Sequence, residues 1–373
     1  MKDKHSEKAS GEQPKNTRSV GEAHSKRGGA GMFGLFGLNG LAHSSDDTVE
    51  IPVAFHGETV LSTTEVPRSW YEHVTHVRSV FDRIHETYGQ MPWYDYSAQT
   101  AVDTRVGGLF QHGVTVHATD VAVATAALPT EVDGVPISVE PSREKHLDDH
   151  LDNTCNENTG TYNCVPGAGY LTGHGCWSST CIAKDSSGTR YLLTSRHPYG
   201  GCGHDVRGMS TYHGESNSVY IGDVKKYNHA FDIVLVDQSG NVNGIDNTII
   251  GESYPVRGHV SESYCDTLIS NYDSVHHNGI STGRTSGYLD AKVQRSQCGK
   301  DKEYLKLTPN AGDGDSGGPH YWINDEYDYI AILGPHEWHT LDSYGNHYRS
   351  FGPAGYAINN DLGWNFGDDS STC

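Results

Sequence analysis

A serine surrounded by glycines is the part of the sequence with the clearest chemical potential. It lies in the stretch Gly312-Asp-Gly-Asp-Ser-Gly-Gly-Pro-His320. Glycine adopts backbone conformations closed to other residues, so this stretch can bend sharply and leave a substrate room to approach the Ser316 hydroxyl. The same bend can aim the backbone N–H groups of Gly314 and Ser316 at one point, which is an oxyanion hole. We therefore expect Ser316 to be a nucleophile rather than an incidental residue of a glycine-rich turn.

A serine nucleophile needs a base and an acid that orients the base, and the sequence offers both upstream. His197 follows a strand-like run that ends at Ser195, and Asp232 stands at the head of the apolar run that reaches Val236. Because a bare carboxylate at the start of a buried strand is costly, Asp232 must have a partner. The order His197, Asp232, Ser316 along the chain is one of the orders in which these three residue types act together.

The cysteines set a second constraint. All eight lie between residues 155 and 373, and an even number confined to one region indicates disulfides in an oxidising compartment. Their pairing cannot be read from the sequence. Zinc is the competing interpretation, but the CxxC spacing is missing and His336-Glu337-Trp338-His339 is one residue short of HExxH. We therefore expect no metal and no cofactor. The residues that could in principle have formed a four-ligand zinc site are Cys176, Cys181, Cys202 and His204.

The formal net charge of −20 excludes whole classes of partner. A nucleic-acid binder needs a basic surface, and so does a protein that binds anionic membranes. No stretch is long enough to span a bilayer. The acidity is shared by both folded parts of the chain, which favours adaptation to concentrated salt over an ordinary acidic surface. The apolar run 31–42 after Lys26-Arg27 could be the core of a signal sequence or a flexible tail. Together with the cysteines, it predicts an extracellular, secreted protein.

Residues 1–45 are polar and lack periodicity, which is typical of a disordered tail or targeting segment. Residues 46–150 predict a small α/β N-terminal domain that ends in a charged linker, residues 143–152. Its main helix covers residues 70–88, where Ser69 and Glu72 form a capping box and Gly89 follows the last turn. The other expected elements are strands at 49–55, 113–118 and 135–140 and a short helix at 120–128.

Residues 151–373 have a different character. Short apolar runs at 191–194, 231–236, 304–307 and 329–333 are separated by Gly, Asn, Ser and Asp. This pattern predicts an all-β domain without a clear helix, built either as a sandwich or as a pair of barrels.

Residues 153–373 resemble a chymotrypsin-fold serine protease (trypsin-like, S1-type), in the style of the compact microbial members. Four stretches carry the resemblance: LLTSRHP at 192–198, FDIVLVD at 231–237, STGRTSGYLDAKV at 281–293 and GDSGGP at 314–319. It implies two six-stranded antiparallel barrels, with Ser316 as nucleophile and His197 as general base and acid. Asp232 would hold the imidazole, and Gly314 and Ser316 would supply the oxyanion-hole hydrogens.

The chain also departs from the family's pattern. Ser195-Arg196 precedes the histidine, and Cys202 comes five residues after it, where the family has a cysteine directly behind the histidine. Further on, residues 355–358 and Trp364 resemble the family's last strand and closing segment.

The resemblance implies further roles around the serine. Asp315 would pair with Arg284, which implies activation without a freed N-terminus. Asn310, six residues before Ser316, would form the base of the substrate pocket, and its lack of charge implies a neutral or apolar residue before the cut. Leu333 and Gly334 would lie on the strand along which substrate adds its backbone.

The function expected from these residues is that of a serine endopeptidase, which acts as a monomer on peptide or protein substrates through an acyl-enzyme. Residues 46–150 would be a pro-region of a zymogen or a permanent binding domain. The alternative functions are a catalytically silent protease-fold binding protein and, more remotely, a zinc-dependent hydrolase.

Overall fold

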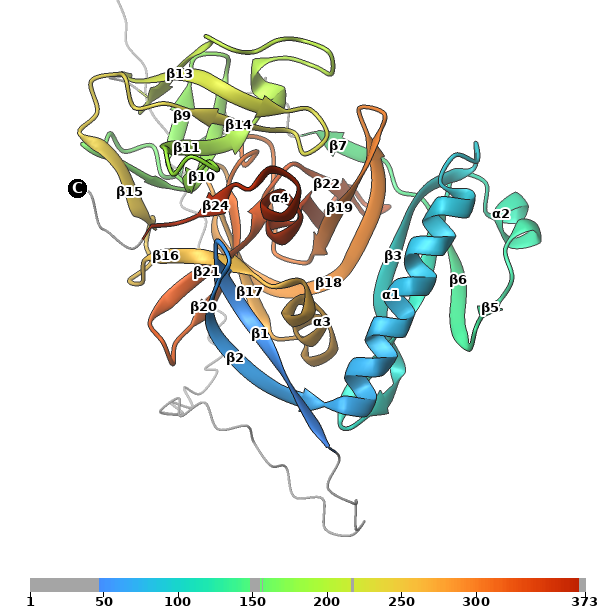
Figure 1. Ribbon diagram of the computed structural model, residues 1–373. Helices are drawn as coiled ribbons and strands as arrows, with labels where there is room; N and C mark the ends of the chain where they lie inside the picture. The colour runs from blue at the N-terminus through green and yellow to red at the C-terminus, as the bar shows by residue number, and fades with distance from the viewer. Residues whose placement is uncertain (1–46, 148–154, 156, 216–217, 369–373) are drawn as a thin grey trace, which may run out of the picture. The chain divides into compact units, whose positions relative to one another are not determined.

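Six antiparallel strands close into a barrel in the part of the chain that carries His197 and Asp232 (Figure 1). The computed structural model describes residues 47–147, 155, 157–215 and 218–368. The closed order is β9-β10-β11-β14-β13-β12, because β12 pairs with β9 as well as with β13. Leu192, Val234 and Val236 are among the side chains that fill its interior. The strands are β9 (Tyr170–Thr172), β10 (Cys176–Lys184), β11 (Arg190–Ser195), β12 (Ser210–His213), β13 (Val219–Asn228) and β14 (Ile233–Val236).

A second barrel is built from six strands that follow residue 273. Antiparallel ladders join them in the order β21-β20-β17-β18-β19-β23. β21 and β23 come together where Gly334 packs against the carbonyl of Pro353, which completes the ring. Val275, Leu289, Leu305 and Ile332 belong to its core. The strands are β17 (Ser274–Gly279), β18 (Gly283–Gln297), β19 (Lys300–Leu307), β20 (Pro319–Asn324), β21 (Tyr329–Pro335) and β23 (His347–Pro353).

The prediction of an all-β region with two six-stranded barrels is thus confirmed, with two helices that were not expected from the sequence. They are α3 (Glu262–Asn271) and α4 (Gly355–Leu362). The segment 355–358, expected to be the last strand, is instead the first turn of α4. Its helical bond from Ile358 N–H to the Ala354 carbonyl, together with the burial of Tyr356 and Ile358, explains the correction.

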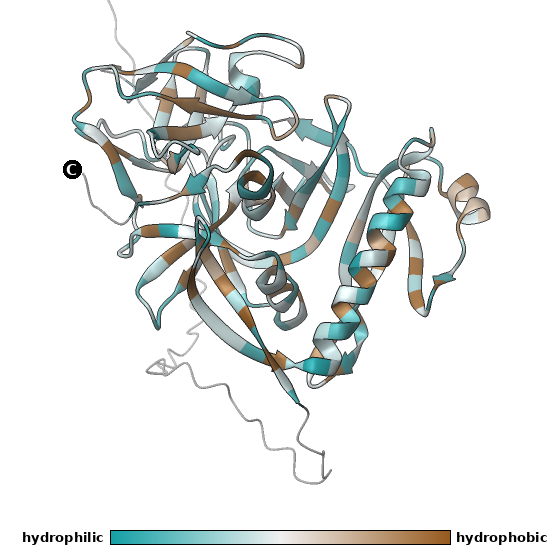
Figure 2. Cartoon of the chain, in the orientation of Figure 1, coloured by the Kyte–Doolittle hydropathy of each residue, from teal (hydrophilic) through white to brown (hydrophobic). Residues whose placement is uncertain are grey.

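The N-terminal α/β segment contains one long helix, α1 (Arg68–Tyr88), whose apolar side is buried. Figure 2 shows hydrophobic and hydrophilic residues alternating along it. α1 begins earlier than predicted, after Pro67, and no side chain caps it, so the predicted capping box is wrong. Gly89 keeps a right-handed conformation (φ −59°) rather than a left-handed cap. The remaining elements are β1 (Thr48–His56), β2 (Thr59–Pro67), β3 (Tyr94–Val106), β4 (Leu109–Ala118), α2 (Val121–Ala127), β5 (Glu131–Val132) and β6 (Val135–Pro141).

The N-terminal segment shares its sheet with the second barrel. β3 pairs antiparallel with β18, from Tyr96 opposite Arg295 to Thr100 opposite Ala291. β1 pairs with β16 (Val256–Val260), a strand that lies beside β21. The described residues from 47 onward accordingly belong to one compact unit. The two parts are therefore joined by backbone hydrogen bonds and not only by side chains.

Buried charges reinforce this junction. Arg78 of α1 lies 2.7 Å from Glu262 and 2.6 Å from Asp266, both on α3, and Lys292 Nζ lies 2.8 Å from Asp266. Burial raises the cost of ionising Asp266, but Lys292 and Arg78 outweigh it and hold its pKa below the ordinary value. Removing the N-terminal segment would leave Asp266 without one of its two cations.

The expected linker 143–152 is not uniformly a linker. Lys145–Leu147 form a strand, β7, which pairs with β22 (Trp338–Leu341), the edge strand beside β23. Residues 148–152 lie outside the described part of the chain. A run of charged residues carries no strand pattern, so only the pairing with β22 reveals this element.

Disulfides join Cys155 to Cys176 and Cys202 to Cys298, whereas Cys181 and Cys265 are buried thiols. Cys176 and Cys202 therefore cannot serve as thiolates in the zinc set considered above. Burial raises the pKa of the Cys181 and Cys265 thiols, which keeps them protonated. The expected tail and signal-like run lie outside the described residues. Among those described, no helix is long and apolar enough to cross a membrane.

Candidate active site

The structure brings His197, Asp232 and Ser316 together between the two barrels. His197 opens a short 3-10 turn (His197–Tyr199) directly after β11, Asp232 precedes β14, and Ser316 precedes β20. His197 Nε2 lies 2.7 Å from Ser316 Oγ, and its Nδ1 is hydrogen-bonded to Asp232 Oδ2. In this arrangement the imidazole can accept the serine proton while the carboxylate stabilises the resulting positive charge.

The backbone holds Asp232 in an uncommon conformation. Its φ of +51° is left-handed, a region that aspartate tolerates better than most residues. The Asp232 carbonyl accepts a hydrogen bond of 2.8 Å from the N–H of Arg196, and β14 pairs with β11 through Ile233 and Ser195. The ladder between these two strands therefore fixes the histidine and the aspartate relative to each other.

Arg196, one of the residues that depart from the family's pattern, is buried beside this pair. Its guanidinium lies 3.5 Å from Asp232 Oδ1, the oxygen that does not bind His197. The same guanidinium donates to the carbonyls of Gly200 and Gly201 at 2.8 and 2.9 Å. Asp232 thus has a permanent cation on one side and an imidazole on the other.

The turn that carries Ser316 depends on glycine at two positions. Gly314 and Gly317 have φ of +94° and +84°, and a Cβ on Gly317 would clash with the Ser178 carbonyl. The Asp315 carbonyl accepts from the N–H of Gly318 at 2.7 Å. Because a trans peptide directs its N–H opposite to its carbonyl, the N–H of Ser316 faces away from that bond. The pairing of the Gly314 and Ser316 N–H groups as an oxyanion hole stays a prediction.

The expected ion pair between Asp315 and Arg284 is not formed. Arg284, about half exposed, pairs with Glu252 instead. Asp315 is fully buried and accepts hydrogen bonds from the Thr282 hydroxyl (2.6 Å) and from the N–H groups of Ser281 (2.7 Å) and Gly312 (3.0 Å). The prediction failed because these local donors, together with a histidine described next, already satisfy the carboxylate.

Three histidines lie buried behind the serine turn. His277, His320 and His336 have ring centroids 4.7 to 5.2 Å apart, and His277 Nε2 lies 3.4 Å from Asp315 Oδ2. Burial lowers the pKa of His320 and His336 well below the ordinary value, so both are neutral. Burial alone would raise the pKa of Asp315, but His277, Thr282 and the Ser281 N–H outweigh it and keep the pKa low. Sequence reasoning missed this cluster because its members come from three different strands or strand ends.

The residues expected to form the substrate pocket lie in different environments. Asn310 is exposed, and its carbonyl accepts from the Thr285 hydroxyl at 2.7 Å. Leu333 is 1% exposed in the core, and Gly334 packs against Pro353. Leu333 and Gly334 therefore do not face a cleft, since Leu333 lies in the core and Gly334 pairs with His320 of β20 on one side and packs against Pro353 of β23 on the other. This part of the prediction is wrong.

The edge beside Ser316 instead begins at His336. The His336 carbonyl accepts from the Gly317 N–H at 2.8 Å and from the Ser195 hydroxyl at 3.0 Å, which ties it to the serine turn. Glu337 and Trp338 follow and lead into β22, whose outer edge holds β7. The sequence drew attention to residues 336–339 only as an incomplete metal motif, so their place at the site was missed.

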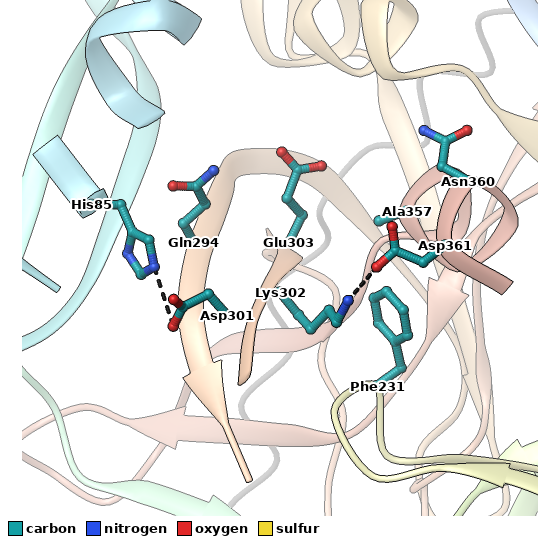
Figure 3. Close-up of a pocket in the computed structure, with 9 residues that line it drawn as sticks. All are labelled: His85, Phe231, Gln294, Asp301, Lys302, Glu303, Ala357, Asn360 and Asp361. Atoms are coloured by element: carbon teal, nitrogen blue, oxygen red, sulfur yellow. Dashed lines mark hydrogen bonds and ion pairs between the residues drawn. The ribbon is translucent and has the colours of Figure 1, made fainter. Parts of the chain in front are cut away.

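A separate pocket of about 230 Å³ lies away from Ser316 (Figure 3). His85 of α1 faces Asp301 at 3.4 Å across it, and Lys302 pairs with Asp361 of α4. It belongs to the junction between the N-terminal segment and the second barrel. The other side chains that line it are Phe231, Gln294, Glu303, Ala357 and Asn360.

No protein-family model and no curated protein matches the chain. Among solved structures it is similar to the Nocardiopsis protease NAPase, with 17% identity and a TM-score of 0.38 over 55% of this chain and 99% of that one. It is also similar to a Cellulomonas bogoriensis chymotrypsin, with 18% identity and a TM-score of 0.37 over 54% of this chain and 97% of that one. A third similar structure is Rv3671c from M. tuberculosis, with 11% identity and a TM-score of 0.32 over 51% of this chain and 82% of that one. Because these TM-scores lie below 0.5, the chymotrypsin-like two-barrel fold is assigned from the strand ladders.

Proposed function

We propose that this protein is a serine endopeptidase that forms an acyl-enzyme on Ser316. The observation that carries the proposal is the continuous line of hydrogen bonds from Ser316 Oγ through His197 to Asp232. Ser316 Oγ would attack the peptide carbonyl while its proton passes to His197 Nε2. The N–H groups of Gly314 and Ser316 would receive the oxyanion, and His197 would then protonate the leaving amine. Water would release the acyl group by the same steps.

Replacement of the nucleophile tests this proposal. Ser316→Ala should abolish both the hydrolysis of a protein substrate and labelling by a serine-directed phosphonate, whereas the control Ser286→Ala should retain both. Full hydrolysis by Ser316→Ala would refute the proposal. Folded protein that neither cleaves nor takes up the phosphonate would favour the silent, partner-binding alternative instead.

We further propose that residues 46–150 act as a pro-region. The support is β7, which lies antiparallel on the edge strand beside Ser316, the way in which an extended peptide binds to a sheet edge. Such a strand would compete with substrate until it is displaced or cut, so the full chain should be slow and the fully active form should start near residue 150. Mass spectrometry of the mature N-terminus, together with the hydrolytic rates of the full chain and of the mature form, tests this, and a full chain as active as the form without residues 46–150 would contradict it.

Export and adaptation to salt complete the proposal. The disulfides Cys155–Cys176 and Cys202–Cys298 are compatible with an oxidising compartment, and the acidic charge is compatible with a salt-rich one. The uncharged Asn310 supports a neutral or apolar residue before the cut. Recovery of the disulfide-bonded protein from the culture medium of its host tests the export.

A further inference from the structure

β7 shows how a peptide lies along the edge next to Ser316. Leu147 stands opposite Trp338 and Lys145 opposite Thr340, so β7 runs toward His336 as it proceeds to its C-terminal end. The His336 carbonyl is bound by the Gly317 N–H, one residue after Ser316. A peptide in this register therefore has its N-terminal part on β22 and its C-terminal part toward Ser316. From the bond between His336 and Gly317 we take the residue opposite His336 as the one whose carbonyl is presented to Ser316.

The side chain of Lys145 occupies a defined place on this edge. Its Nζ lies 3.7 Å from Glu337 Oε1 and 4.9 Å from the centre of the Trp338 ring. Glu337 is 1% exposed, and the Lys145 side chain keeps 22% of its surface in contact with solvent. A carboxylate and the face of an indole are two groups that attract an ammonium, and both gain strength when water is excluded.

Glu337 has few other means of balancing its charge. Gln297 Nε2 donates to Oε1 at 3.0 Å, while Oε2 has no hydrogen-bond partner among the described residues. Arg295 lies over the same tryptophan ring at 4.8 Å. Among the described residues, the ion pair of Glu337 is the one with Lys145. A buried carboxylate is costly without a close cation, so the loss of β7 leaves a site that favours another cation.

We propose that Glu337 and Trp338 form a subsite for a lysine or arginine side chain of the substrate, with Lys145 standing in for that side chain in this structure. The substrates are then peptides with a basic residue upstream of the cut. From the register, this residue lies four positions before the one opposite His336, which makes it the fifth residue before the cleaved bond. The subsite rests on the proposed function, because it presupposes that a peptide is cleaved at Ser316.

The test uses the full chain and internally quenched peptides in which a single lysine moves from the second to the sixth position before the cleaved bond. Norleucine at the same position supplies a neutral side chain of similar length, and mass spectrometry identifies the bond that is cut. We expect kcat/KM to be about tenfold higher for lysine than for norleucine at the fifth position and near equality at the others. Equal rates for lysine and norleucine at every position would overturn the subsite.

Two variants assign the preference to Glu337. In Glu337→Gln the lysine-to-norleucine ratio should fall below about twofold, whereas Glu303→Gln, which changes a half-buried carboxylate elsewhere in the second barrel, should keep the ratio of the unmodified chain. A ratio that survives in Glu337→Gln would overturn the assignment. If Glu337→Gln fails to fold, the lysine-to-norleucine ratio of the unmodified chain at the fifth position still tests whether the subsite exists. Phosphonate labelling of Ser316 without a lysine preference would refute the subsite alone, and absence of labelling and cleavage would refute the proposed function as well.

Discussion

The carboxylate of Asp232 binds an imidazole through one oxygen and faces the guanidinium of Arg196 through the other. A permanent positive charge there attracts the carboxylate and repels a positive charge on His197. The guanidinium also holds the carbonyls of Gly200 and Gly201, so it anchors the loop after the histidine. Arg196 is therefore a positioning residue with an electrostatic effect on its neighbour.

Replacement of Arg196 separates the two roles. Arg196→Met should move the acid limb of the pH profile of kcat/KM upward by roughly half to one pH unit, because the imidazolium is no longer repelled. Arg196→Lys should leave the limb in place while it lowers stability, since the two carbonyl bonds are lost. A limb that stays fixed in Arg196→Met, with only a lower maximum, would show that Arg196 has a structural role alone.

Asp315 and Arg284 give a second contrast between single residues. Asp315→Asn should cost about 2–4 kcal/mol of unfolding free energy, because several buried donors lose a charged acceptor. Arg284→Ala should cost less than about 1 kcal/mol, since its pair with Glu252 is partly exposed. Urea unfolding measures both. Equal losses of unfolding free energy in the two variants would instead indicate that Asp315 and Arg284 form an ion pair, in contradiction to the structure.

At the level of elements, β7 is the contact between the N-terminal segment and the edge beside Ser316. His146 stands opposite His339 in the middle of this three-residue ladder. Proline removes a backbone donor and disrupts a ladder, so His146→Pro should open the edge and speed phosphonate labelling of Ser316 at least about tenfold. The matched control is Glu144→Pro, which lies just outside the strand. Labelling at the rate of the unmodified chain would mean that β7 does not restrict access.

The elements differ in how well the sequence could predict them. The strands at 191–194 and 231–236 are short apolar runs between turn residues, and both were found in the first barrel. α3 was missed although Ser261 caps it and Cys265, Leu268 and Ile269 follow a helical spacing, because the region reads as uniformly β-rich. β7 has no pattern of its own and exists only by pairing with β22.

Some residues of the candidate site could likewise be predicted from the sequence and others could not. Ser316, His197 and Asp232 were found because each stands in a distinctive local stretch. The edge residues Glu337 and Trp338 were missed because their role depends on where β21 ends and β22 begins, which spacing from the serine does not reveal. The partner of Asp315 was missed because His277 is distant in sequence and belongs to no motif.

For the whole molecule, buried neutral histidines make stability depend on pH. Burial lowers the pKa of His112 and His259 from 6.5 to about 4, and lowers those of His320 and His336 further. Above pH 6.5 these groups are neutral in both states. As the pH falls below 6.5 the unfolded chain binds protons that the folded chain does not, so stability is lost progressively, by roughly 3 kcal/mol for His112 alone by pH 4. A urea midpoint that stays constant from pH 7 to pH 5 would contradict this.

The net charge of −20 predicts a dependence on salt. Self-repulsion between acidic groups is screened over about 10 Å at 0.1 M salt and about 3 Å at 1 M. The melting temperature and the hydrolytic rate should therefore both rise with KCl up to molar concentrations. Full stability and activity in dilute buffer would argue against adaptation to salt and leave the catalytic proposal untouched.

Direct capture of the acyl-enzyme tests the central claim most closely. The full chain is mixed with an activated ester substrate, quenched in acid within the first turnover, and mapped by mass spectrometry. We expect one acyl group on the peptide that contains Ser316, with no such adduct in His197→Ala. Turnover of the ester with Ser316 unmodified at every quench time would contradict the proposed mechanism.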